Sequence, residues 1–249
     1  MQARKTLVVP ALDSAFTTPL CKLRIENRRT WVEGSNGKPY NFSRHRGKWW
    51  GILIHTTGCG PEELAKKRGW TTDETAIWTY AQDWMNCSHY LLLSNGIFVQ
   101  ITSEDFIAPH CGVKPWQYAR FKDGTWKDFI PETMLAQWKA AWPGVKSPAD
   151  LYPNAGSANP DVLGVECVPQ PNGTFTDLQY AALHAFVLEV SVHHEMGITA
   201  GRHRLLGHED VNPYFTKDNG RADNKGGWDP GARRPNPKFH WDRVLLTPK

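Results

Sequence analysis

Runs of apolar residues predict three buried β segments in this chain. Residues 49–55 read Trp-Trp-Gly-Ile-Leu-Ile-His, an apolar run that ends in a histidine. Residues 163–168 read Leu-Gly-Val-Glu-Cys-Val, and residues 90–101 have the pattern of a hairpin around an Asn-Gly turn. A polar residue at the end of a strand emerges where ligands bind in open α/β sheets. His55 is therefore the first candidate site residue.

Helical spacing of apolar residues predicts helices between these strands. Three expected helices begin at Thr71, Pro131 and Thr176, and a short final helix spans residues 239–245. Two of them open with a capping box, because Glu74 and Gln179 lie three residues after a threonine. The first should end near residue 86 and the longest near Gly197. Since strands and helices alternate along the chain, the pattern predicts an α/β fold.

Two segments stand apart from this alternation. Residues 1–48 are polar and irregular and read as an N-terminal extension, although short apolar pieces at residues 7–12 and 20–25 could pair as edge strands. Residues 113–162 are rich in Trp, Pro and Gly and read as an insertion. Their tryptophans fit a satellite core under a long loop, or a wall on which a sugar stacks.

Composition excludes several classes of protein. The chain has 249 residues, of which 40% are hydrophobic and 12 are Trp, so disorder throughout is excluded. No apolar run has the ~18–20 residues of a membrane helix, and the first apolar stretch is too short for a secretory signal. The net charge of +4 fits an anionic polymer, but Lys and Arg are too dispersed to suggest nucleic acid.

The chemistry is expected to rest on histidine. Five cysteines without a C-x-x-C pattern suggest neither a zinc ribbon nor a disulfide framework, whereas there are ten histidines. His55, His208 in Gly-His-Glu-Asp, and Asp229 in Trp-Asp-Pro-Gly would satisfy a catalytic zinc ion, which takes three protein ligands and keeps an open position. The spacing of these three residues in the sequence does not distinguish a zinc site from histidines that have an ordinary structural role.

A series of motifs then points to a family. In chain order these are Gly51-Ile-Leu-Ile-His-Thr-Thr-Gly58, Cys87-Ser-His-Tyr-Leu-Leu-Leu-Ser-Asn-Gly96, Ile107-Ala-Pro-His-Cys-Gly112, Leu163-Gly-Val-Glu-Cys167, Phe175-Thr-Asp-Leu-Gln-Tyr-Ala-Ala-Leu183, Gly207-His-Glu-Asp210 and Trp228-Asp-Pro-Gly231. Together they resemble the zinc-dependent N-acetylmuramoyl-L-alanine amidases of the type 2 family, which includes phage endolysins, bacterial cell-wall amidases and animal peptidoglycan-recognition proteins. The resemblance covers about residues 48–246. It implies one catalytic domain, residues 49–249, with a central mixed sheet flanked by helices and a zinc site at the strand ends in an open groove.

The resemblance also implies a role for individual residues. It places His55, His208 and Asp229 on one catalytic Zn²⁺ ion, and Glu166 as the carboxylate that exchanges protons with water and the leaving amine. The third ligand is an aspartate here, because no cysteine follows His208. Related chains often carry a lysine two residues before this aspartate, where this chain has glycine. Lys225 is the nearest candidate for a cation that stabilises the oxyanion.

Two further histidines match family positions with less defined roles. His89 either supports the site from behind or forms a hydrogen bond in the core. His110 resembles a groove residue that faces the muropeptide, and a structural role in its loop is the alternative. Both are expected here as substrate-binding residues.

The expected function is hydrolysis of the amide bond between N-acetylmuramic acid and L-alanine in peptidoglycan. The protein is expected to be a monomer that binds no nucleic acid and has no integral association with a membrane. The alternatives are a non-catalytic muropeptide-binding module, and a Cys-His peptidase that uses Cys59, Cys87 or Cys111. Without a signal peptide, the protein is expected to be made in the cytoplasm. A holin or a secretion machine would then release it to the cell wall, and a cytosolic recycling enzyme is the alternative.

Overall fold

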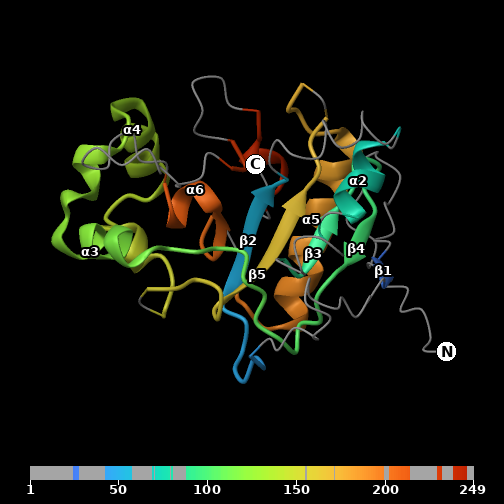
Figure 1. The fold of residues 1–249 in the computed structure, drawn as a ribbon, viewed down its shortest axis with the longest axis horizontal. Helices are drawn as coiled ribbons and strands as arrows, with labels where there is room; N and C mark the ends of the chain where they lie inside the picture. The colour runs from blue at the N-terminus through green and yellow to red at the C-terminus, as the bar shows by residue number, and fades with distance from the viewer. Residues whose placement is uncertain are drawn as a thin grey trace.

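The protein is built around one mixed β-sheet (Figure 1). The computed structural model describes residues 25–27, 43–57, 69, 71–78, 80, 88–154, 156–170, 172–198, 202–213, 229–231 and 238–245. Its six strands are β1 (Ile25–Asn27), β2 (Gly51–Thr56), β3 (Tyr90–Leu92), β4 (Phe98–Gln100), β5 (Val162–Cys167) and β6 (Leu205–Gly207). They lie in the order β1-β4-β3-β5-β2-β6, and only the hairpin β3–β4 is antiparallel. The predicted α/β fold with a mixed sheet is confirmed.

The register of the central strands decides which side chains share a face. Strands β2 and β5 pair in parallel with His55 opposite Glu166 and Leu53 opposite Gly164. Because side chains alternate between the faces of a strand, these four residues lie on one face of the sheet. The isoleucines of β2 point to the opposite face.

Helix α5 (Asp177–His193) covers this opposite face, as the orange ribbon behind the sheet in Figure 1 shows. The predicted capping box is present: the Gln179 N–H donates to Thr176 Oγ1 at 3.1 Å, and the Thr176 N–H donates to Gln179 Oε1 at 3.0 Å. The apolar stripe of the helix, which includes Leu183, Phe186 and Val187, packs on the buried sheet residues in the main core. This helix fixes the sheet from behind and leaves the other face for chemistry.

Among the described residues, helices lie at both sides of the face that carries His55. On one side lies α2 (Thr72–Trp78), whose Ala76 packs in a small core with Leu91 and Val99. On the other side lie α3 (Pro115–Asp123), α4 (Glu132–Ala141) and the short α6 (His208–Val211). Figure 1 shows β2 and β5 between these two groups of helices. The candidate residues therefore lie between two satellite cores.

The insertion at residues 113–162 is more helical than predicted. The helix after Pro131 is confirmed as α4, but α3 was not predicted, nor were the short 3-10 helices η2 (Thr125–Phe129) and η3 (Pro148–Asp150). Proline in the first turn of α3 and Gly124 in left-handed conformation at its end are the signals that mark this helix. Its apolar stripe is too short to be recognised by periodicity alone.

The tryptophans of the insertion form a core. Trp126, Trp138 and Trp142 have relative exposures of 0, 1 and 9%, and they pack with residues of β2 and β6. Trp116 is partly buried against the same cluster. The three buried rings cannot stack on a sugar in this arrangement, so the structure favours the satellite core over the glycan wall.

Part of the predicted N-terminal extension joins the sheet, because β1 pairs in parallel with β4 at the sheet edge. The end of the chain contributes the 3-10 helix η4 (Trp241–Arg243) where a short helix was predicted. The division into residues 1–48 and 49–249 stays a prediction.

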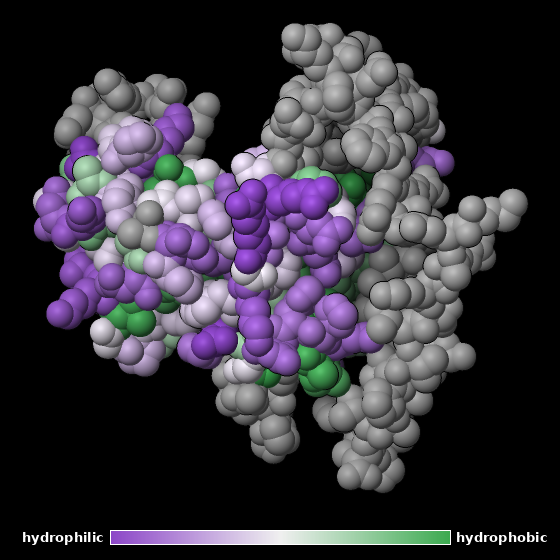
Figure 2. All heavy atoms as spheres, turned by 90° about the horizontal axis from the view of Figure 1, so that it is seen from below, coloured by the Kyte–Doolittle hydropathy of each residue, from purple (hydrophilic) through white to green (hydrophobic). Residues whose placement is uncertain are grey.

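Among the described residues, no helix is both long and apolar enough to cross a membrane. Figure 2 shows a surface on which the described hydrophobic side chains form only small separate patches.

Candidate metal centre

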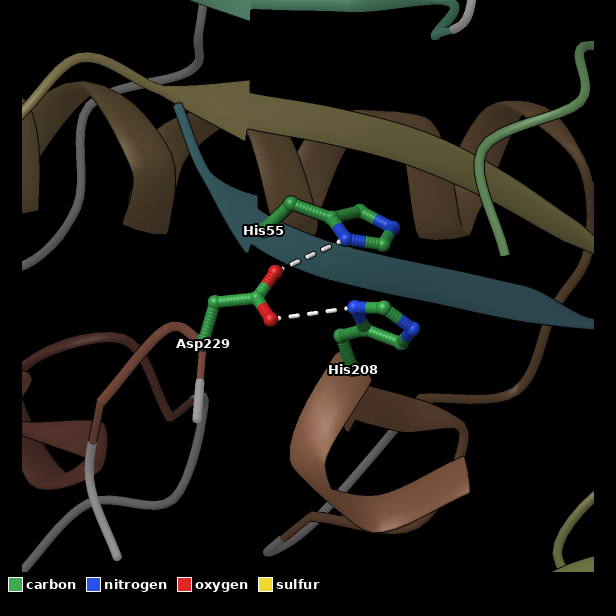
Figure 3. A group of neighbouring side chains, drawn as sticks. All are labelled: His55, His208 and Asp229. Atoms are coloured by element: carbon green, nitrogen blue, oxygen red, sulfur yellow. Dashed lines mark hydrogen bonds and ion pairs between the residues drawn. The ribbon is translucent and has the colours of Figure 1, made fainter. Parts of the chain in front are cut away.

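Three side chains from distant parts of the chain converge at one point (Figure 3). His55 comes from the end of β2, His208 is the first residue of α6, and Asp229 comes from a turn near the C-terminal end. Asp229 Oδ2 lies 3.0 Å from His55 Nδ1, and Asp229 Oδ1 lies 3.0 Å from His208 Nδ1. One ligand atom from each residue lies within 4.8 Å of the others. The structure therefore brings the predicted ligand residues together.

Backbone contacts hold two of these residues in place. The Glu209 N–H donates to the carbonyl oxygen of Asp229 at 2.8 Å, which ties the turn to the start of α6. A Cβ atom on Gly207 would lie 2.7 Å from Pro230 Cδ, so glycine is required for the turn to approach β6 this closely. The distance between His208 and Asp229 is thus set by the main chain.

Helix α6 is in turn fixed to the insertion by Asp210, which is fully buried. The Trp142 Nε1–H donates to Asp210 Oδ1 at 2.8 Å, and the Trp138 Nε1–H donates to the Asp210 carbonyl oxygen at 3.0 Å. Asp210 also forms an ion pair with Arg202 and accepts a hydrogen bond from the Gly207 N–H at 2.6 Å. The tryptophan-rich insertion therefore supports the short helix that presents His208.

The charges in this cluster favour the binding of a cation. Burial alone would raise the pKa of Asp229, but the charge of His208 and its hydrogen bond to the carboxylate hold it well below its usual range. Burial alone would lower the pKa of His208, yet the Asp229 carboxylate raises it above its usual range. His55 remains neutral, because burial lowers its pKa. The partly buried Asp229 carboxylate thus stays ionised and attracts a cation.

A chain of hydrogen bonds determines where the proton of neutral His55 lies. Its Nε2 atom is 3.1 Å from His110 Nδ1, and His110 Nε2 is 3.2 Å from the carbonyl oxygen of Val162. A carbonyl oxygen only accepts, and burial keeps the pKa of His110 far below its usual value, so the single proton of His110 lies on Nε2. His110 Nδ1 then accepts from the Nε2–H of His55. The hydrogen-bond network therefore assigns an unprotonated Nδ1 to His55.

This assignment shows that the cluster fits a metal ion. The lone pair of His55 Nδ1 faces a carboxylate oxygen of Asp229 at 3.0 Å, and two acceptors without a proton between them repel each other. A cation among the three side chains removes this repulsion. Two imidazole nitrogens and one carboxylate oxygen are the donor set of a catalytic zinc site, and Zn²⁺ to ligand distances of about 2.0–2.2 Å are compatible with these separations.

Glu166 lies beside this cluster on the same face of the sheet. Its strand places it opposite His55, and its side chain is buried, with 7% exposure. Burial, together with the negative charge of Asp229, raises the pKa of Glu166 to about 8. The Tyr80 hydroxyl donates to Glu166 Oε2 at 3.4 Å. A carboxyl group that titrates near neutral pH can both accept and donate a proton.

The two other predicted histidines both lie close to this site. His110 contacts His55 directly, as described above. His89 is fully buried; its Nδ1 accepts from the Gly164 N–H at 3.0 Å and its Nε2 donates to the Phe106 carbonyl oxygen at 3.0 Å. Burial lowers the pKa of His89 to about 4. Both ring nitrogens of His89 are engaged by the backbone, which favours the core role over contact with substrate.

Some predicted residues cannot be placed, and some neighbours were not predicted. Lys225 lies outside the described residues, as do Cys59 and Cys87. Cys111 is buried and interacts with the His208 ring. No role for Tyr80 or Asp210 was predicted from the sequence. Asp210 belongs to the Gly-His-Glu-Asp motif, which could have indicated its role. Tyr80 fitted the apolar stripe of a predicted helix, so nothing marked it as a site residue.

Comparisons with known proteins agree with the sequence motifs. A family model described as N-acetylmuramoyl-L-alanine amidase matches residues 45–232. No curated protein sequence is significantly similar to the chain.

Three solved structures are similar to the chain at low identity. The N-acetylmuramoyl-L-alanine amidase LysC from Clostridium intestinale URNW is 14% identical, with a TM-score of 0.35 over 81% of this chain and 91% of that one. The endolysin amidase LysCS from the same organism is 13% identical, with a TM-score of 0.34 over 79% and 88% of the two chains. A selenomethionine derivative of AmpD is 15% identical, with a TM-score of 0.42 over 94% and 97%.

Proposed function

Since the chain belongs to the N-acetylmuramoyl-L-alanine amidase family, whose substrate is peptidoglycan, we propose that His55, His208 and Asp229 bind the one Zn²⁺ ion of the catalytic site. The observation that carries this proposal is the convergence of three ligand atoms within 4.8 Å, beside Glu166 on one face of the sheet. The unprotonated Nδ1 of His55 facing Asp229 supports it. When bound, the zinc ion supplies Lewis acidity, which acidifies water and polarises the carbonyl group of the scissile amide.

Glu166 moves the protons of the reaction. Its carboxylate accepts a proton from the attacking water as the oxygen bonds to the lactyl carbonyl carbon. The carboxyl group then donates that proton to the amine of L-alanine as the C–N bond breaks, so the group ends in its starting state. The pKa of about 8 belongs to the site without an ion, and the charge of a bound Zn²⁺ would lower it, which favours the carboxylate form that accepts the first proton. Tyr80 orients the carboxyl group through Oε2.

The remaining predicted residues assist this step. We assign Lys225 as the cation near the carbonyl oxygen, where positive charge stabilises the developing oxyanion. His110 acts on the site through His55, and His89 supports Gly164 and thereby the floor of the site. The chain offers a complete set of metal ligands, unlike a module that only binds muropeptides.

The cell wall is the proposed setting, and its polymeric peptidoglycan is the proposed substrate. The net charge of +4 favours association with anionic wall polymers. Digestion of purified sacculi and of soluble anhydro-muropeptides, followed side by side by mass spectrometry, tests this assignment. Faster cleavage of sacculi supports the wall, and faster cleavage of soluble muropeptides supports a recycling enzyme.

The activity test uses purified cell walls and protein with measured zinc content. Wild-type protein should release free L-alanine amino termini without new reducing sugars. His208→Ala should lose both zinc and activity, whereas Glu166→Gln should retain zinc and lose about 10²–10⁴-fold in kcat. Full activity after complete removal of zinc, or in His208→Ala, would contradict the proposal. Retained activity after thiol alkylation excludes the Cys-His peptidase.

A further inference from the structure

A second group of metal-ligating side chains lies at the C-terminal end of α5. Glu104 follows β4, His193 is the last residue of α5, and His194 caps the helix. One ligand atom from each of these residues lies within 4.8 Å of the others. None of them belongs to the catalytic cluster. We propose that Glu104, His193 and His194 form a second site for a first-row divalent metal such as Zn²⁺.

Glu104 is held in the conformation that such a site requires. The Tyr90 hydroxyl donates to Glu104 Oε1, and Glu104 Oε2 lies 2.9 Å from His194 Nε2. The side chains of Glu104 and His194 are 22% and 17% exposed, so the pair is shielded yet reachable from solvent. Burial alone would raise the pKa of Glu104, but the hydrogen bonds from His194 and Tyr90 lower it overall. The carboxylate is therefore ionised and ordered before any metal binds.

The two histidines supply the nitrogen donors. Their rings contact each other edge to face, with centroids 4.7 Å apart. His194 is positioned by the helix end, because its N–H donates to the Val190 carbonyl oxygen at 3.0 Å. His193 is exposed and leaves one side of the cluster open to water. A nitrogen of each ring and a carboxylate oxygen of Glu104 all lie within 4.8 Å of one another.

A further carboxylate adds negative charge to this site. Glu189 lies one helical turn before His193 and interacts with its charge. Among the described residues, Glu189 Oε2 is buried without a hydrogen-bond partner. Side chains four residues apart lie on the same face of a helix, so Glu189 is adjacent to the proposed ligands.

The donor set determines which ions are expected. Two imidazoles and one carboxylate suit Zn²⁺ and its first-row neighbours, whereas Mg²⁺ and Ca²⁺ prefer oxygen ligands. A bound ion would add a link between the end of α5 and the segment after β4, beside the His194–Glu104 contact. The expected effect is greater stability of the fold, with no direct part in hydrolysis.

Zinc stoichiometry of untagged protein tests the proposal. Competition with a chromophoric chelator should give two Zn²⁺ ions per wild-type chain, one in His193→Ala, one in His208→Ala and none in the double variant. His193 is exposed, and its replacement leaves the His194–Glu104 contact in place, so this variant should fold and keep amidase activity. His203→Ala, at another exposed histidine, is the matched control and should bind two ions.

Thermal unfolding gives an independent measurement. In the His208→Ala background, micromolar Zn²⁺ should raise the Tm, Mg²⁺ should not, and the added His193→Ala change should abolish the rise. Equal zinc binding in wild type and His193→Ala would overturn the second site. Failure of the catalytic zinc proposal has a different signature, namely that His208→Ala binds as much zinc as wild type.

Discussion

At the scale of single residues, His110 determines which nitrogen of His55 is available to the metal. Replacing His110 by Ala removes the acceptor for the His55 Nε2–H, so the ring can rotate and its proton can move to Nδ1. We expect zinc affinity to fall about 10–100-fold, as is typical when a partner of a ligating histidine is lost. Competition with a chelator measures this affinity directly.

The matched control is His110→Asn, because the Oδ1 atom of asparagine can occupy the position of His110 Nδ1 and accept the same hydrogen bond. This variant should recover most of the affinity that His110→Ala loses. Equal affinity in wild type and His110→Ala would show that the chain of hydrogen bonds has no influence on the metal. The ring of His110 also requires the bare backbone of Gly164, since a Cβ atom there would lie 2.6 Å from it.

Glu166 gives the metal-free protein a defined pH dependence of stability. Its pKa is about 8 in the folded protein, above the ordinary value of 4.5. The folded state therefore holds a proton that the unfolded state releases between these values. The corresponding stability is fully present below about pH 4.5 and is lost as the pH rises through 8, with a maximum slope of about 1.4 kcal/mol per pH unit.

Denaturant unfolding in the presence of a chelator, at pH 6 and pH 9, measures this loss. Glu166→Gln carries no titrating group and should show a smaller decrease between the two pH values than wild type. The difference between the two proteins reports on Glu166 and on His208, whose charge interacts with it. An equal decrease in both would contradict the raised pKa.

At the scale of elements, the tryptophan-rich insertion stabilises α6 through Asp210. Asp210→Ala removes the buried carboxylate that pairs with the partly buried Arg202 and accepts from the Trp142 indole. We expect a loss of about 3–5 kcal/mol in the free energy of unfolding, as for other broken buried ion pairs. Zinc affinity should fall as well, because His208 lies two residues before Asp210.

Trp142→Phe provides the comparison for this element. It removes one indole donor while it keeps an aromatic ring in the core, so the loss should be nearer 1–2 kcal/mol, with zinc affinity little changed. Urea unfolding and chelator competition on the two variants separate the two effects. If Asp210→Ala were as stable as wild type, the insertion would not support the site.

At the scale of the whole molecule, local signals predicted the sheet and its covering helix well. The apolar runs that became β2 and β5, and the capping box at Thr176, depend on neighbouring residues, so the sequence alone reveals them. The convergence of His55, His208 and Asp229 depends on the order of strands in the sheet and on a turn held by a main-chain contact, which no local pattern contains. The motif resemblance supplied that information. The helix α3 was missed because its core contacts come from segments distant in the sequence.

The 3.0 Å contact between two hydrogen-bond acceptors, His55 Nδ1 and Asp229 Oδ2, also bears on the stability of the folded protein. These two atoms repel each other unless a cation lies between them, so binding of the proposed zinc ion would also stabilise the folded chain. Each tenfold increase in free zinc above the dissociation constant then adds about 1.4 kcal/mol to the stability of the folded state. If the proposed zinc site is occupied, the zinc-loaded chain should therefore resist proteolysis better than the zinc-free chain, before it meets any substrate.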